Sequence, residues 1–262
     1  MLHSTDISTG RTSQKSEPLL SVDNLCRQVS ANWIWNNISF DLAAGDRLAL
    51  TGSSGSGKSL LLRTLSGLDV IASGPSGENG SIRFAGKSLH EWEMPQYRSK
   101  VCYIQQHPTF FDETVEANLK RVFRLKAHQN IKYDREKILS RLQQLAPPNT
   151  ASDSSGTNDY DGFLERPAKE LSGGEAQIAA LLRVLQLEPQ VLLLDEPTSS
   201  MDVELTKLFE KLLEKWQREI PENQTNSPNS TPQRAWIWVS HNPEQLRRMC
   251  SKTFCLDREN GN

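Results

Sequence analysis

The sequence lacks a long hydrophobic run, and hydrophobic residues make up only 36% of its 262 positions. No stretch approaches the roughly 18–20 continuous apolar residues that a membrane-spanning helix needs. We therefore expect that the chain does not cross a bilayer by itself. Adding the 15 glycines brings the apolar fraction only to about 42%, whereas average chains are about 45–50% apolar on a count that includes glycine, so polar surface segments are predicted.

Other absences narrow the class of protein further. Thirty Lys and Arg against 32 Asp and Glu give a net charge of −2, so no nucleic acid partner is expected. The four cysteines show no C-x-x-C spacing, which disfavours a disulfide framework and indicates a reducing compartment. Residues 1–18 lack the apolar segment of a secretory signal and are expected to form a flexible polar arm. We expect a soluble, cytoplasmic protein.

From residue 19 onward, short apolar runs alternate with amphipathic segments. Strands are predicted at 19–22, 37–42, 47–51, 82–85, 191–194 and 235–240. Helices are predicted at 59–66, 175–187 and 202–219, after the last strand up to 249, and over most of 113–145 with a charged interruption near 130–134. A polar loop at 147–161 and a proline-containing surface insertion at 221–234 separate these elements. The alternation predicts an α/β protein with a largely parallel sheet.

Residues 52–59, GSSGSGKS, match the P-loop pattern G-x-x-x-x-G-K-[ST] between a predicted strand and a predicted helix. Such a loop points backbone N–H groups at a phosphate chain, while Lys58 reaches the β- and γ-phosphates and the Ser59 hydroxyl ligates Mg²⁺. A glycine-serine linker could match by chance, but this is about a 1% event in such a chain. The predicted nucleotide-binding residues are Gly52, Ser53, Ser54, Gly55, Ser56, Gly57, Lys58, Ser59 and Leu60.

Residues 191–197, VLLLDEP, place two carboxylates at the end of an apolar strand. Asp195 can hold the Mg²⁺ of a P-loop site, and Glu196 can accept a proton from an attacking water. Alone, such a pair is usually part of a solvated loop. The P-loop upstream favours the catalytic interpretation.

Residues 171–175, LSGGE, open a helix with a second arrangement suited to an anion. Ser172 can cap the helix, and Gly173 and Gly174 allow a phosphate to approach the backbone. Simple helix capping would also explain these residues. Their position shortly before Asp195 favours a second cradle, which would serve another molecule's nucleotide.

In this order, the P-loop, LSGGE, VLLLDEP and a histidine after the last strand resemble the ATPase subunit of an ABC transporter. The resemblance covers about residues 19–256. It implies one ABC-type P-loop NTPase domain over 19–262, with a largely parallel sheet core, an antiparallel β edge and a helical subdomain at about 107–188. It also implies ATP and Mg²⁺, a separate transmembrane permease subunit, and a second copy closing around ATP as a dimer on the inner face of the cell membrane.

The resemblance implies roles for further residues. Gln106, in YIQQHP, is similar to the glutamine that touches Mg²⁺ and senses the membrane partner, and Gln105 fits that pattern less well. Asp202, in SSMD, resembles a residue of the loop that makes contacts across the dimer. His241 resembles the histidine that contacts the γ-phosphate, although an isolated histidine would more often be a capping or surface residue. The implied catalytic set is Lys58, Gln106, Glu196 and His241, and the implied metal set is Ser59, Gln106 and Asp195.

Two features depart from the family or stay open. The aromatic residue that stacks on adenine in the family should fall near Val29, so either Trp33 provides the stack or none exists. Trp33 and Trp35 could equally pack in the core or on a sheet face. Phe110 and Phe111 lie where the family docks its membrane partner, with core packing as the alternative.

The sequences of the segments 107–119, 171–202 and 236–246 most resemble those of bacterial ATPases of the iron-export type. No metal-ligand cluster in the sequence supports that assignment. The motifs specify neither the transported substrate nor its direction. An ABC ATPase without a transporter, as in iron–sulfur assembly, is the alternative, and co-purifying partners would separate the two. A regulator without turnover is disfavoured by the presence of Glu196 and His241.

Overall fold

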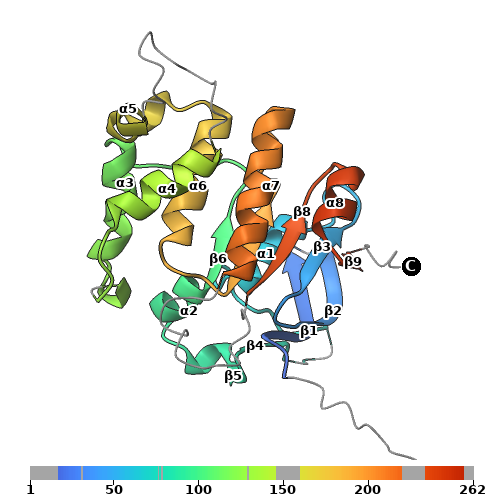
Figure 1. The fold of residues 1–262 in the computed structure, drawn as a ribbon. Coiled ribbons are helices and arrows are strands. Elements are labelled where there is room, and N and C mark those ends of the chain that lie inside the picture. Colours follow the sequence, from blue (N-terminus) through green and yellow to red (C-terminus); the bar gives the residue numbers. More distant parts are fainter. Residues whose placement is uncertain are drawn as a thin grey trace, which may run out of the picture.

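The structure, a computed structural model, describes residues 17–30, 32–75, 77, 79–128, 130–145, 160–219 and 234–256. Its centre is a five-stranded sheet in the order β6-β7-β8-β3-β9 (Figure 1). Its strands pair in parallel: β3 (Arg47–Thr51), β6 (Val101–Ile104), β7 (Val191–Asp195), β8 (Ala235–Val239) and β9 (Lys252–Cys255). All residues of β7 and β8 are buried, as expected for strands covered on both faces. The predicted parallel core is confirmed.

A second, antiparallel sheet has the order β2-β1-β4-β5. Its strands are β1 (Leu20–Val29), β2 (Asn32–Leu42), β4 (Ser81–Phe84) and β5 (Lys87–Ser88). The strands predicted at 19–22 and 37–42 cover only part of the long β1–β2 hairpin. Register shifts between Val22 and Gln28 interrupt the two-residue alternation by which strands are recognised. The antiparallel edge is confirmed, with longer strands than predicted.

Side chains of the parallel sheet alternate between two hydrophobic clusters. Leu193 belongs to the cluster that includes α1 (Lys58–Leu65) and residues of the antiparallel sheet. Leu192 belongs to the cluster that includes α6 (Gly173–Leu185) and α7 (Val203–Arg218). The helix that follows the P-loop is therefore packed into the same apolar cluster as both sheets, which holds the loop at its start in place.

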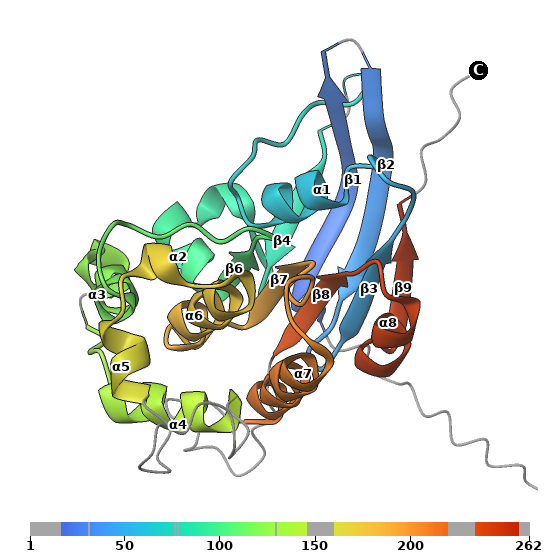
Figure 2. The same cartoon turned by 90° about the horizontal axis from the view of Figure 1, so that it is seen from above.

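The remaining helices are short. They are α2 (Met94–Lys100), α3 (Val115–Arg121), α4 (Arg135–Leu145), α5 (Tyr160–Glu165) and α8 (Pro243–Met249), with 3₁₀ turns η1 (Leu89–Glu91), η2 (Val122–Arg124), η3 (Lys126–His128) and η4 (Ala168–Glu170). Helices α3, α4 and α5 gather on one side, away from β1 and β2 (Figure 2). The predicted interruption near 130–134 separates η3 from α4. The boundaries of a helical subdomain at 107–188 stay a prediction. No helix in the described ranges is both long and apolar enough to span a membrane.

Three predicted polar segments lie largely outside the described residues: 1–16 of the arm, 147–159 of the loop and 221–233 of the insertion. Tyr160 and Asp161 begin α5, so the loop ends before residue 160. Arg234 is buried, and its guanidinium pairs with Glu188 and lies 5.2 Å from the ring centre of Trp216. The prediction of a surface insertion is wrong at Arg234, because a carboxylate and an aromatic ring receive the buried cation.

Glu188 lies between α4 and the start of β8 and joins them by charge. Its carboxylate accepts a hydrogen bond from Lys137 at 2.8 Å and pairs with Arg141 at 3.5 Å and with Arg234. Burial alone would raise the pKa of Glu188, but the Lys137 hydrogen bond and the neighbouring positive charges outweigh it and lower the pKa. The ionised carboxylate therefore fastens the helical side of the molecule to the central sheet.

Candidate nucleotide and catalytic site

Residues 52–57 form a tight loop between β3 and α1. The last position of this loop, residue 57, has room only for glycine. Gly57, the N-cap of α1, has a φ of +91°. A Cβ atom there would lie 2.6 Å from Ile34 Cγ2 and 2.7 Å from Trp35 Nε1. Because these distances are shorter than real Cβ contacts, the loop geometry depends on glycine at this position.

Lys58 supplies the positive charge of the loop. Its Nζ donates hydrogen bonds to the carbonyl oxygens of Gly52 and Ser53 at 2.8 and 2.9 Å. A groove of about 400 Å³ opens at the loop. It is lined by Val29, Ile34, Ser54, Gly55, Gly57, Lys58, Ser59, Leu60, Asp195, Glu196, Val239 and His241. The predicted P-loop and the predicted residues after β7 and β8 therefore share one groove.

Asp195, the last residue of β7, is held by a tyrosine from the neighbouring strand. The Tyr103 hydroxyl donates a hydrogen bond to Asp195 Oδ2 at 2.9 Å. Burial and the nearby Asp195 carboxylate raise the pKa of Tyr103, which keeps the hydroxyl protonated as a donor. Sequence reasoning missed Tyr103, because only the pairing of β6 with β7 brings it beside Asp195.

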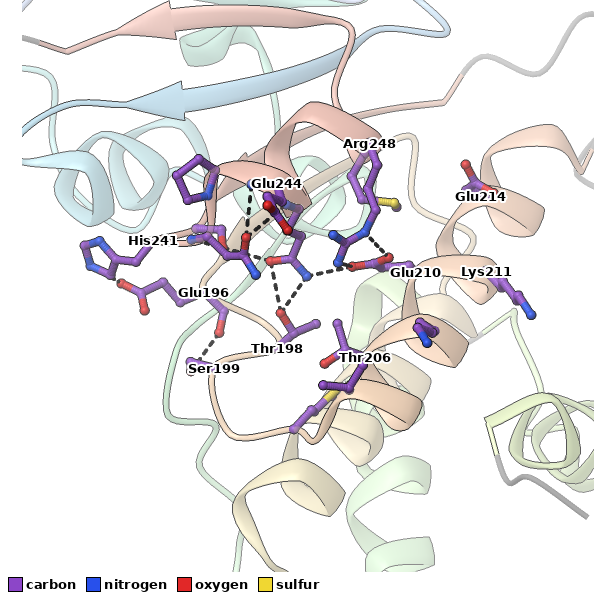
Figure 3. Close-up of a pocket in the computed structure, with 18 residues that line it drawn as sticks. Glu196, Thr198, Ser199, Thr206, Glu210, Lys211, Glu214, His241, Glu244 and Arg248 are labelled. Carbon is purple, nitrogen blue, oxygen red and sulfur yellow. Dashed lines mark hydrogen bonds and ion pairs between the residues drawn. The ribbon is translucent and has the colours of Figure 1, made fainter. Parts of the chain in front are cut away.

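Two predicted catalytic residues, Gln106 and His241, contact the carboxylate of a third, Glu196. Gln106 Nε2 donates to Glu196 Oε2 at 3.2 Å, and His241 Nε2 lies 3.0 Å from Glu196 Oε1. Figure 3 shows the His241 ring and the Glu196 carboxylate directed toward each other. The Glu196 backbone N–H donates to the carbonyl of Val239 at 3.0 Å, and its φ is +47°. Each oxygen of the Glu196 carboxylate thus has one side-chain partner, and the Glu196 backbone is held by its hydrogen bond to Val239.

Gln106, rather than Gln105, points its amide at this carboxylate. The Gln105 amide instead lies 3.5 Å from the Thr109 hydroxyl. Gln177 on α6 is fully buried, and its Nε2 donates to the backbone carbonyl of Gln106 at 2.6 Å. The segment that carries Gln106 is therefore anchored to the helix that starts at the LSGGE motif.

The LSGGE residues cap a helix and lie apart from the P-loop groove. Ser172 and Glu175 form a reciprocal capping box at the start of α6. Of the described residues that line the P-loop groove, none is Ser172, Gly173 or Gly174. Asp202 caps α7 by accepting a hydrogen bond from the Leu205 N–H at 2.8 Å. Within one chain, these residues are positioned by capping and do not reach the P-loop.

The aromatic residues near the groove separate into buried and exposed ones. Trp35 is buried in the core beside Gly57, so core packing is the correct alternative for it. Trp33 and Val29 are exposed and line a hollow of about 430 Å³ together with Ile34. Val29 and Ile34 also line the P-loop groove. The surface available beside the phosphate cradle is therefore mainly aliphatic, with Trp33 at its edge.

Phe110 and Phe111 differ in the same way. Phe110 packs against the cluster of α6 and α7, with the Arg183 guanidinium 4.8 Å from its ring centre. Phe111 is more than half exposed, with the Arg121 guanidinium 3.6 Å from its ring centre. Core packing thus accounts for Phe110, and Phe111 stays available at the surface.

The donor set suits Mg²⁺ bound together with phosphates. Among the described residues, no group of three or more His, Cys, Asp or Glu side chains could hold a metal ion alone. The groove nevertheless brings the Ser59 hydroxyl and the Asp195 carboxylate together beside the P-loop. Mg²⁺ is typically bound by one or two carboxylates and by substrate phosphates, so these residues fit it.

The known proteins that this chain resembles include components of ABC transporters. A family model described as "ABC transporter" matches residues 35–199. The chain is 32% identical over 233 residues to the "Probable iron export ATP-binding protein FetA" of Escherichia coli (strain K12), covering 89% of each chain. It is 29% identical over 237 residues to the "Phosphate import ATP-binding protein PstB" of Saccharolobus solfataricus, covering 90% of this chain and 83% of that one. The structure of cbiO1 from Clostridium perfringens, part of the ABC transporter complex cbiONQ, matches with a TM-score of 0.65 at 22% identity, covering 91% of this chain and 84% of that one.

Proposed function

This chain belongs to the ABC transporter family of ATP-binding subunits, and on that premise we propose how its residues bind and hydrolyse ATP. It is an ATPase that powers a transporter, and subunits of this kind act with membrane subunits. The observation that carries the catalytic proposal is the convergence of Gln106 and His241 on Glu196, at the groove of the P-loop.

ATP occupies the groove with its phosphates on residues 52–59. Lys58 exchanges its two carbonyl partners for the β- and γ-phosphates, which are stronger partners because they are charged. The nucleoside lies toward Val29 and Ile34, the aliphatic side of the groove, with Trp33 next to it.

Mg²⁺ would be held by Ser59 and Asp195, with Gln106 nearby through its hydrogen bond to Glu196. When bound, the ion would neutralise negative charge on the β- and γ-phosphates. Tyr103 leaves one oxygen of the Asp195 carboxylate free for the ion, because its hydroxyl occupies the other.

Glu196 acts as the general base. Water attacks the γ-phosphorus, its proton passes to Glu196, and the bond from the γ-phosphorus to the β–γ bridging oxygen breaks. Gln106 and His241 orient the carboxylate from its two oxygens. The His241 side chain is largely exposed, so its ring is free to turn toward the γ-phosphate.

A second copy completes the site. The residues Ser172–Gly174 do not line the groove of their own chain, so a phosphate cradle there would serve the ATP of the partner copy. Asp202 is the N-cap of α7, and the segment just before it contacts the start of α6, since a Cβ added at Gly173 would lie 2.8 Å from the Ser200 Cβ. Two copies closing head to tail would therefore enclose two ATP molecules.

The transport path belongs to a separate permease. This chain binds that permease on the inner face of the cell membrane. Phe111, Leu125 and Ile131 are exposed apolar residues in the segment that contains α3, and they suit contact with that partner. The 32% identical relative is described as a probable iron export protein, so iron export is the first cargo to test.

Lys58→Ala tests the assignment of the nucleotide site. We expect the variant to lose ATP turnover and ATP binding together, because Lys58 is the only lysine among the described residues that line the groove. Full turnover by a folded Lys58→Ala protein would contradict the assignment. Co-purification of the wild-type chain with a multi-span membrane protein supports the transporter role, and recovery with a scaffold that lacks membrane spans would favour the assembly-factor alternative.

A further inference from the structure

A buried polar side chain connects the two loops that carry Glu196 and His241. A groove of about 1040 Å³ runs between α7 and α8, with Glu196 and His241 among its lining residues (Figure 3). Gln245 of α8 lines the same groove, and only 2% of its surface is exposed. Gln245 takes no direct part in the proposed hydrolysis step.

The Gln245 amide contacts one residue from each loop. Its Nε2 donates to the Thr198 hydroxyl at 2.9 Å, and its Oε1 accepts from the Ser240 hydroxyl at 2.8 Å. Thr198 follows Glu196 by two residues, and Ser240 directly precedes His241. One side chain therefore fixes the separation between the loop after β7 and the loop after β8.

The amide is itself held from the opposite side. Gln245 Nε2 donates to Glu210 Oε1 at 2.8 Å, and Arg248 donates to both oxygens of Glu210 at 2.8 and 2.6 Å. Because a carboxylate paired with Arg248 can only accept, the nitrogen of the amide must face Glu210. The orientation of Gln245 is thus determined by Glu210 of α7. Through its contacts with Thr198 and Ser240, Gln245 in turn positions the two catalytic loops.

We propose that Gln245 is a positioning residue for hydrolysis, which sets the geometry of Glu196 against His241 through Thr198 and Ser240. This inference rests on the proposed roles of Glu196 and His241. Gln245 is not among the described residues that line the P-loop groove, so its loss should slow the chemical step without weakening ATP binding. A misplacement of about 1 Å costs up to about 100-fold in rate, so we expect a loss of roughly 10- to 100-fold in kcat.

Gln245→Leu is the direct test, and Gln217→Leu is its matched control. Gln217 is also a buried glutamine, placed at the C-terminal end of α7, where its amide contacts Gly45 and Arg47. Both variants lose buried hydrogen bonds and some stability in chemical denaturation. In the full-length chain, Gln245→Leu should lower kcat and leave KM for ATP unchanged, whereas Gln217→Leu should keep both. Equal kcat losses in the two variants, or an unchanged kcat in Gln245→Leu, would overturn the proposal.

A charge exchange keeps the proposal testable if Gln245→Leu does not fold. Gln245→Glu places a second carboxylate against Glu210 and should lower kcat. Combining it with Glu210→Gln restores one amide and one carboxylate facing each other, so the double variant should regain a large part of the lost kcat. A folded double variant as slow as the single one contradicts a role in positioning.

Two variants distinguish a failure of the proposed function from a failure of the positioning role of Gln245. If Glu196→Gln retains normal turnover, the assignment of the base is wrong, whatever Gln245 does. If Glu196→Gln is inactive while Gln245→Leu keeps its kcat, only the positioning role is wrong.

Discussion

Substituting Gly57 by alanine perturbs the phosphate cradle at a single atom. The added Cβ would lie within 3 Å of Ile34 and Trp35, and Trp35 is buried, so its ring has little room to move. The backbone of Gly57 also has a φ of +91°, which an alanine side chain rarely adopts. The substitution therefore combines backbone strain with overpacking.

The two effects can be given magnitudes. A left-handed backbone costs an alanine about 1–2 kcal/mol, and overpacking a filled site costs about 1–3 kcal/mol. Gly57→Ala should therefore lower the free energy of unfolding by about 2–5 kcal/mol. The strain is relieved by moving the loop, so ATP binding should be lost in the protein that remains folded.

Gly45→Ala separates the two contributions. Gly45 has a similar φ of +85°, but an added Cβ there meets no atom within 4 Å. Its cost should be limited to the backbone strain of about 1–2 kcal/mol, and its ATP affinity should equal that of the wild type. Urea denaturation gives the stabilities, and a fluorescent ATP analogue gives the affinities. If Gly57→Ala binds ATP normally, or loses no more stability than Gly45→Ala, the steric argument is refuted.

Further predictions concern charge and metal binding. Glu188→Gln should cost about 3 kcal/mol of unfolding free energy, because it leaves the buried Arg234 without its anion. Since the folded pKa of Glu188 is lowered, its contribution is present above the unfolded carboxyl pKa of about 4.3 and is lost as pH falls through the folded pKa. Urea titrations between neutral and acidic pH should show a weaker acid dependence in the variant, and an unchanged one contradicts this. Tyr103→Phe should weaken Mn²⁺ binding to the ATP-bound protein about 10-fold in EPR titrations, because Asp195 loses its orienting hydrogen bond, and unchanged affinity would show that Tyr103 has no such role.

Motifs carried by contiguous residues could be predicted from the sequence, and contacts between distant strands could not. The loop at 52–59 was recognisable because its glycines and lysine are adjacent in the chain. Glu196 was predicted from its place after an apolar strand downstream of the P-loop, whereas Gln106 and His241 were predicted through a family resemblance. The ends of β6, β7 and β8 bring the three together. Tyr103 and Gln245 belong to no contiguous motif. Their roles follow from strand pairing and helix packing.

Short elements were the hardest to predict. Strands β6 and β9 and helix α2 are only 4–7 residues long, which is too short for a clear periodic pattern. Residue 234 was placed in a polar insertion because 221–234 contains prolines and few apolar residues. Arginine is normally exposed, and Glu188 reverses that preference by pairing with Arg234. Gln245 could have been singled out by its position. It is a polar residue four positions after His241, on the face of α8 that packs inward.

We propose that Glu196 is the base of an ATPase that closes as a dimer around ATP. The most direct measurement is the molar mass of Glu196→Gln with ATP and Mg²⁺, by size-exclusion chromatography with light scattering, together with its ATP turnover. We predict that the variant binds ATP, does not hydrolyse it, and elutes at twice its monomer mass, while the ATP-free protein elutes as a monomer. Wild-type turnover, or a monomer in saturating ATP, would contradict the account.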